Sequence, residues 1–228
     1  MSRRCPSCAA KPAWHLSDGR WKCRRCGHRY RYRVVWDAQR ISGRDKTRLL
    51  EFFVLGVPAY RLRFRLALAP STIERFYRLT RAALAIEQLA TLSVATSSGT
   101  ADSRLLRLGV CLEDGCARLL DPAGVPLGAD VVRPQAIMEF RNDRISIQRR
   151  DLSGTTGRPG DGLENFWSFV NHWLHSYRGV PPKNLPPYLG EICFRFNHRE
   201  QDLFPLVNKL LRRTPLQDVM PAIGPDSP

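Results

Sequence analysis

The sequence predicts a multi-domain α+β protein with an N-terminal zinc ribbon, a helical helix-turn-helix segment, and a C-terminal layer in which strands precede helices. Three observations predict this order. Two C-x2-C pairs lie near the N-terminus, apolar residues at helical spacing follow them, and strand-like runs then come before further amphipathic helices. We expect domains over residues 1–36, 44–90 and 104–213, with a flexible Pro-rich tail over 214–228.

The chain is strongly basic, with 36 Lys and Arg against 21 Asp and Glu among 228 residues and a formal net charge of +15. This excess predicts a polyanionic partner, of which nucleic acid is the usual one and a membrane surface the competing one. The sequence has no run of eighteen apolar residues, and Met1-Ser2-Arg3-Arg4-Cys5 lacks the apolar core of a signal peptide. We therefore expect a cytoplasmic, nucleoid-associated protein that does not bind membranes.

The first motif is C-x2-C, fourteen residues, C-x2-C, formed by Cys5, Cys8, Cys23 and Cys26. Each pair can hold an ion from a tight turn, and two pairs together make a tetrahedral all-thiolate site, which suits structural zinc. Asp18-Gly19 lies between the pairs and predicts a hairpin turn. Four thiolates make His15 and His28 surplus as ligands, and a pair of redox-active CxxC motifs is the alternative.

The same segment is rich in basic residues. Up to Trp36 it carries ten Lys or Arg and one Asp, with aromatic residues between them. Basic side chains neutralise phosphates, and aromatic rings can pack on sugars or bases. We therefore predict that the ribbon binds double-stranded DNA, with a solvated basic face as the alternative. The candidate contacts are Arg24, Arg25, Arg29, Arg31 and Arg33.

Helical periodicity follows. Asp45 is a candidate N-cap for a helix that ends near Gly56, Pro58 opens a second short helix, and Ser71 is a candidate N-cap for a third. Three short helices with a tight connection before the third are typical of a helix-turn-helix, whose third helix enters the major groove. A helical bundle with a basic exterior is the alternative. The DNA contacts expected on the third helix are Thr72, Arg75 and Arg78, with Arg81 as a further candidate.

The C-terminal half carries strand-like patterns and then helical ones. Turn signals at Glu113-Asp114-Gly115 and Asn142-Asp143 separate the strands. Strands are expected over 105–112, 116–120, 137–140 and 145–148, and helices over 163–177, 185–196 and 202–213. This order of elements predicts an α+β or α/β layer.

Two strings in this half carry a resemblance. Residues 162–169 read Gly-Leu-Glu-Asn-Phe-Trp-Ser-Phe at the start of an apolar helix, and residues 194–199 read Phe-Arg-Phe-Asn-His-Arg. They resemble the last catalytic helix of small bacterial insertion-sequence transposases of the DDE type, and the Phe-Arg-Phe-Asn-x-Arg phrase that follows it. The resemblance implies an RNase H-like α/β core over 104–213, recognition of terminal inverted repeats by the preceding modules, and a homo-oligomer on paired ends.

The resemblance also implies three carboxylates that hold two magnesium ions for strand transfer. Glu164 would be one of them, although by helix rules alone it is an acid that complements the helix dipole. The stretch that corresponds to the first acid, residues 92–100, contains none, so Asp102 is the nearest substitute. Asp130 lies thirty-four residues before Glu164 and suits the second acid, with Asp143 as the alternative.

These patterns support three interpretations of function. The first is a DDE-type transposase that recognises element ends and transfers strands. The second is a decayed or domesticated relative that binds DNA as a regulator, and the incomplete acid set favours it, since one carboxylate cannot hold two magnesium ions for in-line transfer. The third is a zinc-ribbon transcription or RNA-processing factor, which leaves the Trp-rich helix around Glu164 unexplained.

Overall fold

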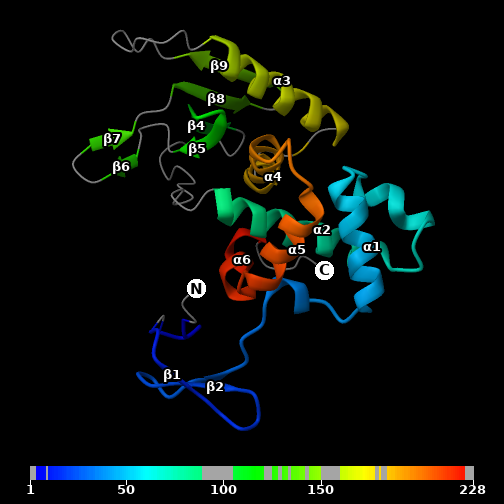
Figure 1. The fold of residues 1–228 in the computed structure, drawn as a ribbon, viewed down its shortest axis with the longest axis vertical. Coiled ribbons are helices and arrows are strands. Elements are labelled where there is room, and N and C mark those ends of the chain that lie inside the picture. The colour runs from blue at the N-terminus through cyan, green and yellow to red at the C-terminus, as the bar shows by residue number, and fades with distance from the viewer. Residues whose placement is uncertain are drawn as a thin grey trace.

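The computed structural model shows three parts along the longest axis of the molecule (Figure 1). A small sheet lies at one end, a helical body in the middle, and a larger sheet with a covering helix at the other end. This mixture of helices and sheets confirms the α+β class. The structure describes residues 4–8, 10–88, 105–120, 125–127, 130–132, 135–141, 144–149, 160–177, 180 and 184–223.

The small sheet is the ribbon. Its three antiparallel strands, in the order β1-β2-β3, are β1 (Ala13–His15), β2 (Trp21–Cys23) and β3 (Arg29–Tyr30). The predicted hairpin turn is confirmed, because Gly19 has a φ of 76° and its N–H donates to the carbonyl of Leu16. Among the described residues of this part, Cys5, Cys23 and Tyr30 are the buried ones. So small a core needs a further source of stability, which a metal can supply.

Backbone hydrogen bonds connect the end of the ribbon to the C-terminal part of the chain. The ribbon leads into the 3-10 helix η1 (Val35–Asp37). Val34 forms an isolated antiparallel bridge with Pro215, and the Val35 N–H donates to the Thr214 carbonyl at 3.0 Å. Residues that lie almost 180 positions apart in the sequence therefore pair directly, and they tie the ribbon to the C-terminal helices.

The helical body begins with the three elements expected for a helix-turn-helix, namely α1 (Gly43–Val54), η2 (Ala59–Phe64) and α2 (Pro70–Gln88). Two expected caps are wrong. Ser42, rather than Asp45, caps α1, since its hydroxyl accepts from the Asp45 N–H at 3.0 Å. Ser71 is not an N-cap, because α2 already begins at the preceding proline. The middle element is a 3-10 helix.

Helix α2 is the centre of this body. Residues 79–85 of α2 are all buried, and the core around them also contains residues from α4 (Leu185–Asn197), α5 (Leu203–Arg213) and α6 (Leu216–Ile223). At the crossing of α2 and α4, a Cβ added to Gly190 would lie 2.4 Å from the Cα of Ala85, so only glycine allows this approach. The segment 44–90 therefore shares its core with the C-terminal helices.

The expected flexible tail is wrong for residues 214–223. Helix α6 occupies this segment, and Val219 is fully buried in the helical core. Proline near a helix start is compatible with a helix, because the missing N–H is not needed there. Packing against the helical core accounts for a helix that composition alone does not predict.

The larger sheet has the strand order β5-β4-β8-β9 and is antiparallel throughout. The strands expected from the sequence are confirmed, and a separate pair, β6 and β7, is added. Antiparallel pairing departs from the expected α/β core, in which most strands are parallel. The turn at Asn142-Asp143 lies outside the described residues. The strand bounds are β4 (Leu105–Glu113), β5 (Cys116–Leu120), β6 (Val125–Leu127), β7 (Asp130–Val132), β8 (Ala136–Arg141) and β9 (Arg144–Arg149).

One face of this sheet carries the second core. Leu108 and Val110 alternate along β4, and they pack with residues of β5, β8, α3 (Gly160–Ser176) and α4. Helices on one face of an antiparallel sheet are the α+β arrangement. Among the described helices, none combines the length and apolar character that a membrane span requires.

Candidate metal centre and nucleic-acid interface

The four cysteines of the two C-x2-C pairs meet at one point, where their sulfur atoms all lie within 4.8 Å of one another. Sγ of Cys5 lies 3.6 Å from Sγ of Cys26, and Sγ of Cys8 lies 3.5 Å from Sγ of Cys23. Each pair thus faces the other, as a shared ion requires and two separate redox pairs do not. Among the described residues, this is the single group of three or more metal-ligating side chains.

Backbone donors favour the thiolate form of Cys23, whereas burial and contacts with the other three sulfurs raise the pKa of Cys8 to about 12. The pKa of Cys23 falls to about 6, chiefly because the backbone N–H of Cys26 donates to its sulfur, and the N–H of Arg25 adds a second bond at 3.3 Å. Such bonds favour the charged sulfur, which is the form that binds metal. The turn that aims these N–H groups includes Gly27, whose φ is 71°. Four sulfur donors fit zinc in a closed structural site.

Neither histidine of the ribbon joins this group. The His15 ring instead lies 4.8 Å from the Trp21 ring, and the His28 ring stacks on Tyr30 at 6.2 Å. The structure therefore brings the four cysteines together and leaves both histidines outside the group.

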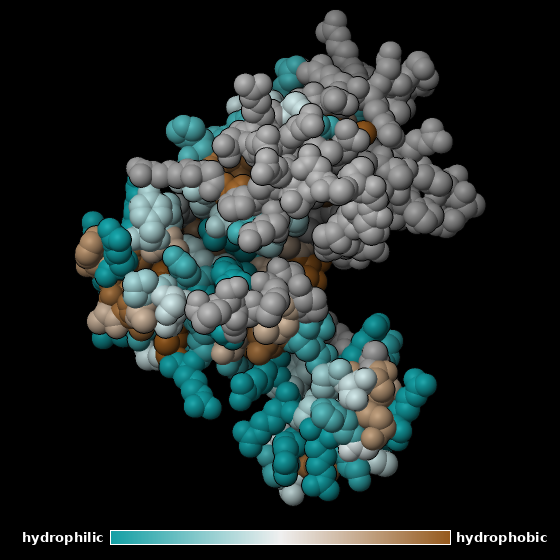
Figure 2. All heavy atoms as spheres, turned by 180° about the vertical axis from the view of Figure 1, so that it is seen from behind, coloured by the Kyte–Doolittle hydropathy of each residue, from teal (hydrophilic) through white to brown (hydrophobic). Residues whose placement is uncertain are grey.

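The ribbon presents a basic surface around this centre, and Figure 2 shows hydrophilic side chains over most of it. Its single acid, Asp18, is held by Arg20, whose Nε donates to the carboxylate at 2.6 Å. That hydrogen bond holds the pKa of Asp18 below its usual value. The predicted DNA contacts are all exposed, namely Arg24, Arg25, Arg29, Arg31 and Arg33.

Trp14 is a candidate contact that the sequence analysis missed. Its ring is 49% exposed, with the Lys22 ammonium 5.9 Å and the Arg24 guanidinium 5.3 Å from the ring centre. Trp14 and Lys22 are paired across β1 and β2. The sequence did contain an indication of this contact. A ribbon with so small a core has little room for a large aromatic residue inside, so a tryptophan beside basic strand residues points to the surface.

The predicted contacts on α2 separate into two groups. Arg78 is exposed, while Thr72 and Arg75 are half-buried at the N-terminal part of the helix. Arg81 is buried and paired with Glu191, so its expected DNA contact is wrong. Burial is continuous from Leu79 to Ala85, so the predicted contacts that remain accessible lie before this run.

The expected acids do not form a described site. Glu164 is exposed in α3, and Asp130 is the first residue of β7, where it pairs with Leu127. Asp102 and Asp143 lie outside the described residues. Among the side chains that the structure describes, no three carboxylates are close enough to share an ion.

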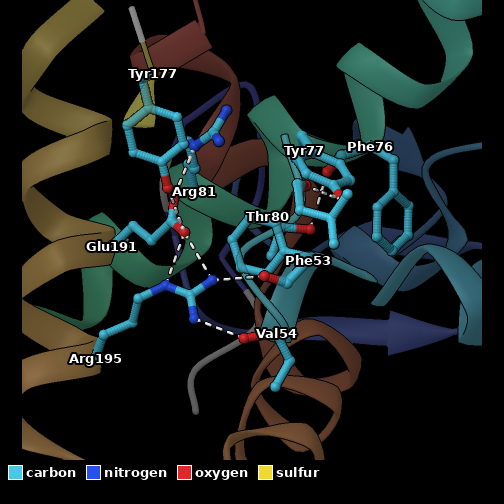
Figure 3. Close-up of polar contacts among 10 residues, drawn as sticks. Phe53, Val54, Phe76, Tyr77, Thr80, Arg81, Tyr177, Glu191 and Arg195 are labelled. Atoms are coloured by element: carbon cyan, nitrogen blue, oxygen red, sulfur yellow. Dashed lines mark hydrogen bonds and ion pairs between the residues drawn. The ribbon is translucent and has the colours of Figure 1, made fainter. Parts of the chain in front are cut away.

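A buried ionic network joins α2 to α4 (Figure 3). Glu191 of α4 accepts from Arg81 Nε at 2.7 Å and from Arg195 Nε at 2.9 Å, and the Tyr177 hydroxyl donates to it at 3.1 Å. Burial alone would raise the pKa of Glu191, but the two guanidinium groups outweigh it and hold the pKa below its usual value. The carboxylate is thus charged and fully satisfied at neutral pH.

Arg195 extends this network to a third helix. Its two terminal nitrogens donate to the last carbonyls of α1, at 2.6 Å to Phe53 and 2.9 Å to Val54 (Figure 3). A cation is favourable at a helix C-terminus, where carbonyl groups lack partners. The guanidinium also lies 4.3 Å from the centre of the Trp173 ring of α3.

The other residues of the Phe-Arg-Phe-Asn-x-Arg motif connect the helical core with the core of the larger sheet. Phe194 packs in the helical core and Phe196 in the sheet core. Asn197 pairs with both backbone groups of Ala117 in β5, at 2.7 and 2.9 Å, and donates to Gln88 of α2 at 2.8 Å. This role was not predicted from the sequence. The sequence feature that could have indicated it is the presence of charged residues inside apolar helices, because charged residues are rarely buried unless they are paired.

Comparisons of this chain with protein-family models, with curated proteins and with solved structures find no match.

Proposed function

We propose that this protein is a transposase-like DNA-binding protein that uses a zinc-stabilised ribbon and a helix-turn-helix to recognise the ends of an insertion element. The observation that carries the proposal is a four-cysteine group in a ribbon that also has five exposed arginines. The ion holds the ribbon in shape, and the arginines neutralise phosphates. The resemblance of residues 162–169 and 194–199 to DDE-type transposases supports the element end as the target.

Duplex DNA suits the arrangement better than other polyanions. The ribbon offers guanidinium groups and a half-exposed indole, and α2 offers its first turns, with Arg78 exposed. Helix N-terminal residues are the part of a recognition helix that contacts base edges, while a basic ribbon can follow the phosphate backbone. The protein acts in the cytoplasm at the nucleoid, and two copies hold paired ends.

Strand transfer is not part of the proposal. Residues 92–100, the stretch that corresponds to the first acid of the implied set, contain no Asp or Glu. This favours the second candidate, a domesticated regulator that keeps recognition and lacks chemistry. A strand-transfer assay with magnesium that compares wild type with Glu164→Gln separates the two, because activity lost in the variant alone would support the catalytic transposase.

The proposal is tested with fluorescence-labelled duplexes that carry the repeats flanking the gene, or the same bases scrambled. We expect tighter binding to the repeats, and loss of bound zinc and of this preference in Cys23→Ser. Cys116→Ser is the matched control, since Cys116 is exposed in β5 and outside the metal group. Binding to promoters instead of repeats would support the transcription factor, and a zinc-free protein that ignores DNA would exclude all three interpretations.

A further inference from the structure

The segment between α1 and α2 exposes an unusual amount of apolar surface. Of the five large hydrophobic side chains that are exposed among the described residues, three lie here: Leu55 is 75%, Tyr60 is 41% and Phe64 is 84% exposed. No acid occurs between Glu51 and Glu74, and the segment contributes three arginines. We call Tyr60, Arg61, Arg63, Phe64 and Arg65 the η2 surface.

Buried neighbouring residues and one hydrogen bond fix the position of these side chains. Leu62 and Leu66 are buried in the helical core, and the Tyr77 hydroxyl of α2 donates to the Val57 carbonyl at 2.9 Å. With these anchors inside, the residues between and beside them must point outward. The exposure of Phe64 therefore follows from a well-anchored turn and not from a loosely packed one.

The aromatic and basic side chains of the η2 surface are already in contact. The Arg63 guanidinium lies 4.5 Å from the centre of the Phe64 ring. The Arg61 guanidinium lies 5.8 Å from that of Tyr60, and its Nε donates to the Tyr60 hydroxyl at 3.3 Å. These contacts restrict both partners and place positive charge over an exposed ring. The combination suits a partner with both phosphates and apolar sugar or base surfaces.

We propose that the η2 surface is a second DNA-contacting site, in which Arg61, Arg63 and Arg65 bind phosphates and the Phe64 ring packs into the adjacent minor groove. The inference rests on the proposed function, because it places this contact next to the recognition turns of α2. The acid-free sequence gives the charge complementarity, and an apolar ring flanked by arginine is the kind of side chain that enters a minor groove.

The test measures binding of the full-length protein to a short random-sequence duplex over a range of salt concentrations. Phe64→Ala should weaken binding by about fivefold or more with an unchanged salt slope. Arg61→Ala with Arg63→Ala should lower the salt slope by about 0.9 for each phosphate that is no longer neutralised. Phe64→Trp should restore the affinity.

Two exposed residues elsewhere provide the controls, because Met220→Ala removes an exposed apolar side chain of α6 and Lys209→Ala an exposed charge of α5. Neither should change affinity or slope, and all variants should keep zinc and the wild-type unfolding midpoint. If the wild type binds the duplex and the η2-surface variants bind it equally well, the inference is overturned and the proposed function stands. If the wild type does not bind the duplex, the proposed function is overturned. Phe64→Ala that loses binding to phosphatidylserine vesicles and keeps DNA binding would also overturn the inference.

Discussion

Glu191 is the residue on which the junction of the two cores depends. Its carboxylate is buried and receives hydrogen bonds from two arginines and a tyrosine that come from α2, α4 and the end of α3. A buried ion pair adds little net stability over an apolar replacement, yet removal of one partner leaves an uncompensated charge. The network therefore fixes how the helices meet more than it adds to the free energy of unfolding.

Replacement of Glu191 by Gln should lower the free energy of unfolding by about 3 kcal/mol or more, because two buried guanidinium groups lose their counter-ion. Urea unfolding followed by circular dichroism measures the change. Glu200→Gln is the matched control, since Glu200 is 88% exposed and its contact with Arg199 spans 3.7 Å. A surface pair of this kind contributes at most about 1 kcal/mol. Equal losses in the two variants would contradict this role for Glu191.

The same carboxylate should make stability depend on pH. Its pKa in the folded protein lies below the ordinary value of 4.5, so the unfolded chain binds the proton first as the pH falls. The contribution of Glu191 is therefore complete above pH 4.5 and is lost as the pH drops through the folded pKa. Unfolding free energies of wild type and Glu191→Gln should converge over that range, and a constant difference would contradict the assignment.

At the scale of elements, α2 and α4 can cross closely because Gly190 has no side chain. Gly190→Ala should lower the free energy of unfolding by about 1 to 3 kcal/mol, because the new Cβ would overlap the backbone of Ala85. Gly162→Ala in α3 is the control, since its Cβ would meet Leu112 at an ordinary 3.5 Å. Urea unfolding distinguishes them, and a stable Gly190→Ala variant would mean that the helices can separate without cost.

The elements that could be predicted are those whose signal is local. The cysteine spacing identified the metal group, and one apolar stripe each identified α1, α3 and α5. In the second half of α2, Thr80 and Arg81 are buried together with the apolar residues, so the sequence pattern does not say which elements surround this part. Helix α6 could not be predicted because its proline-rich composition is typical of a tail, and its order comes from a partner far away in the sequence.

The candidate site divides in the same way. The exposed arginines of the ribbon follow from charge and spacing, whereas Arg81 looks like its neighbours Arg75 and Arg78 until its buried partner Glu191 is known. Helical spacing alone could not separate these arginines, because the buried face widens along α2 as α4 packs against it. Long-range packing thus determines which of the predicted contacts stay exposed.

At the scale of the whole molecule, the first and last parts of the chain support each other. The bridge between Val34 and Pro215 joins the ribbon to α6, and Val219 holds α6 in the helical core. Val219→Asp should lower the free energy of unfolding by about 3 kcal/mol or more, since it buries an unpaired charge. Hydrogen exchange should also show reduced protection at the Val35 N–H, which donates to Thr214.

Met220→Asp is the control for this prediction, because Met220 is the next residue of α6 and is 36% exposed. It should leave both the unfolding free energy and the exchange rate of Val35 near their wild-type values. If Val219→Asp unfolds the body while the Val35 amide stays protected, the ribbon is held by contacts other than the bridge.

The phrase at residues 194–199 fills both cores, caps α1 and clamps β5, and every one of these tasks concerns folding. A chain that abandoned chemistry would still have to keep it in order to fold. Folding alone thus accounts for these six residues, and what the protein binds has to be inferred from side chains elsewhere in the chain.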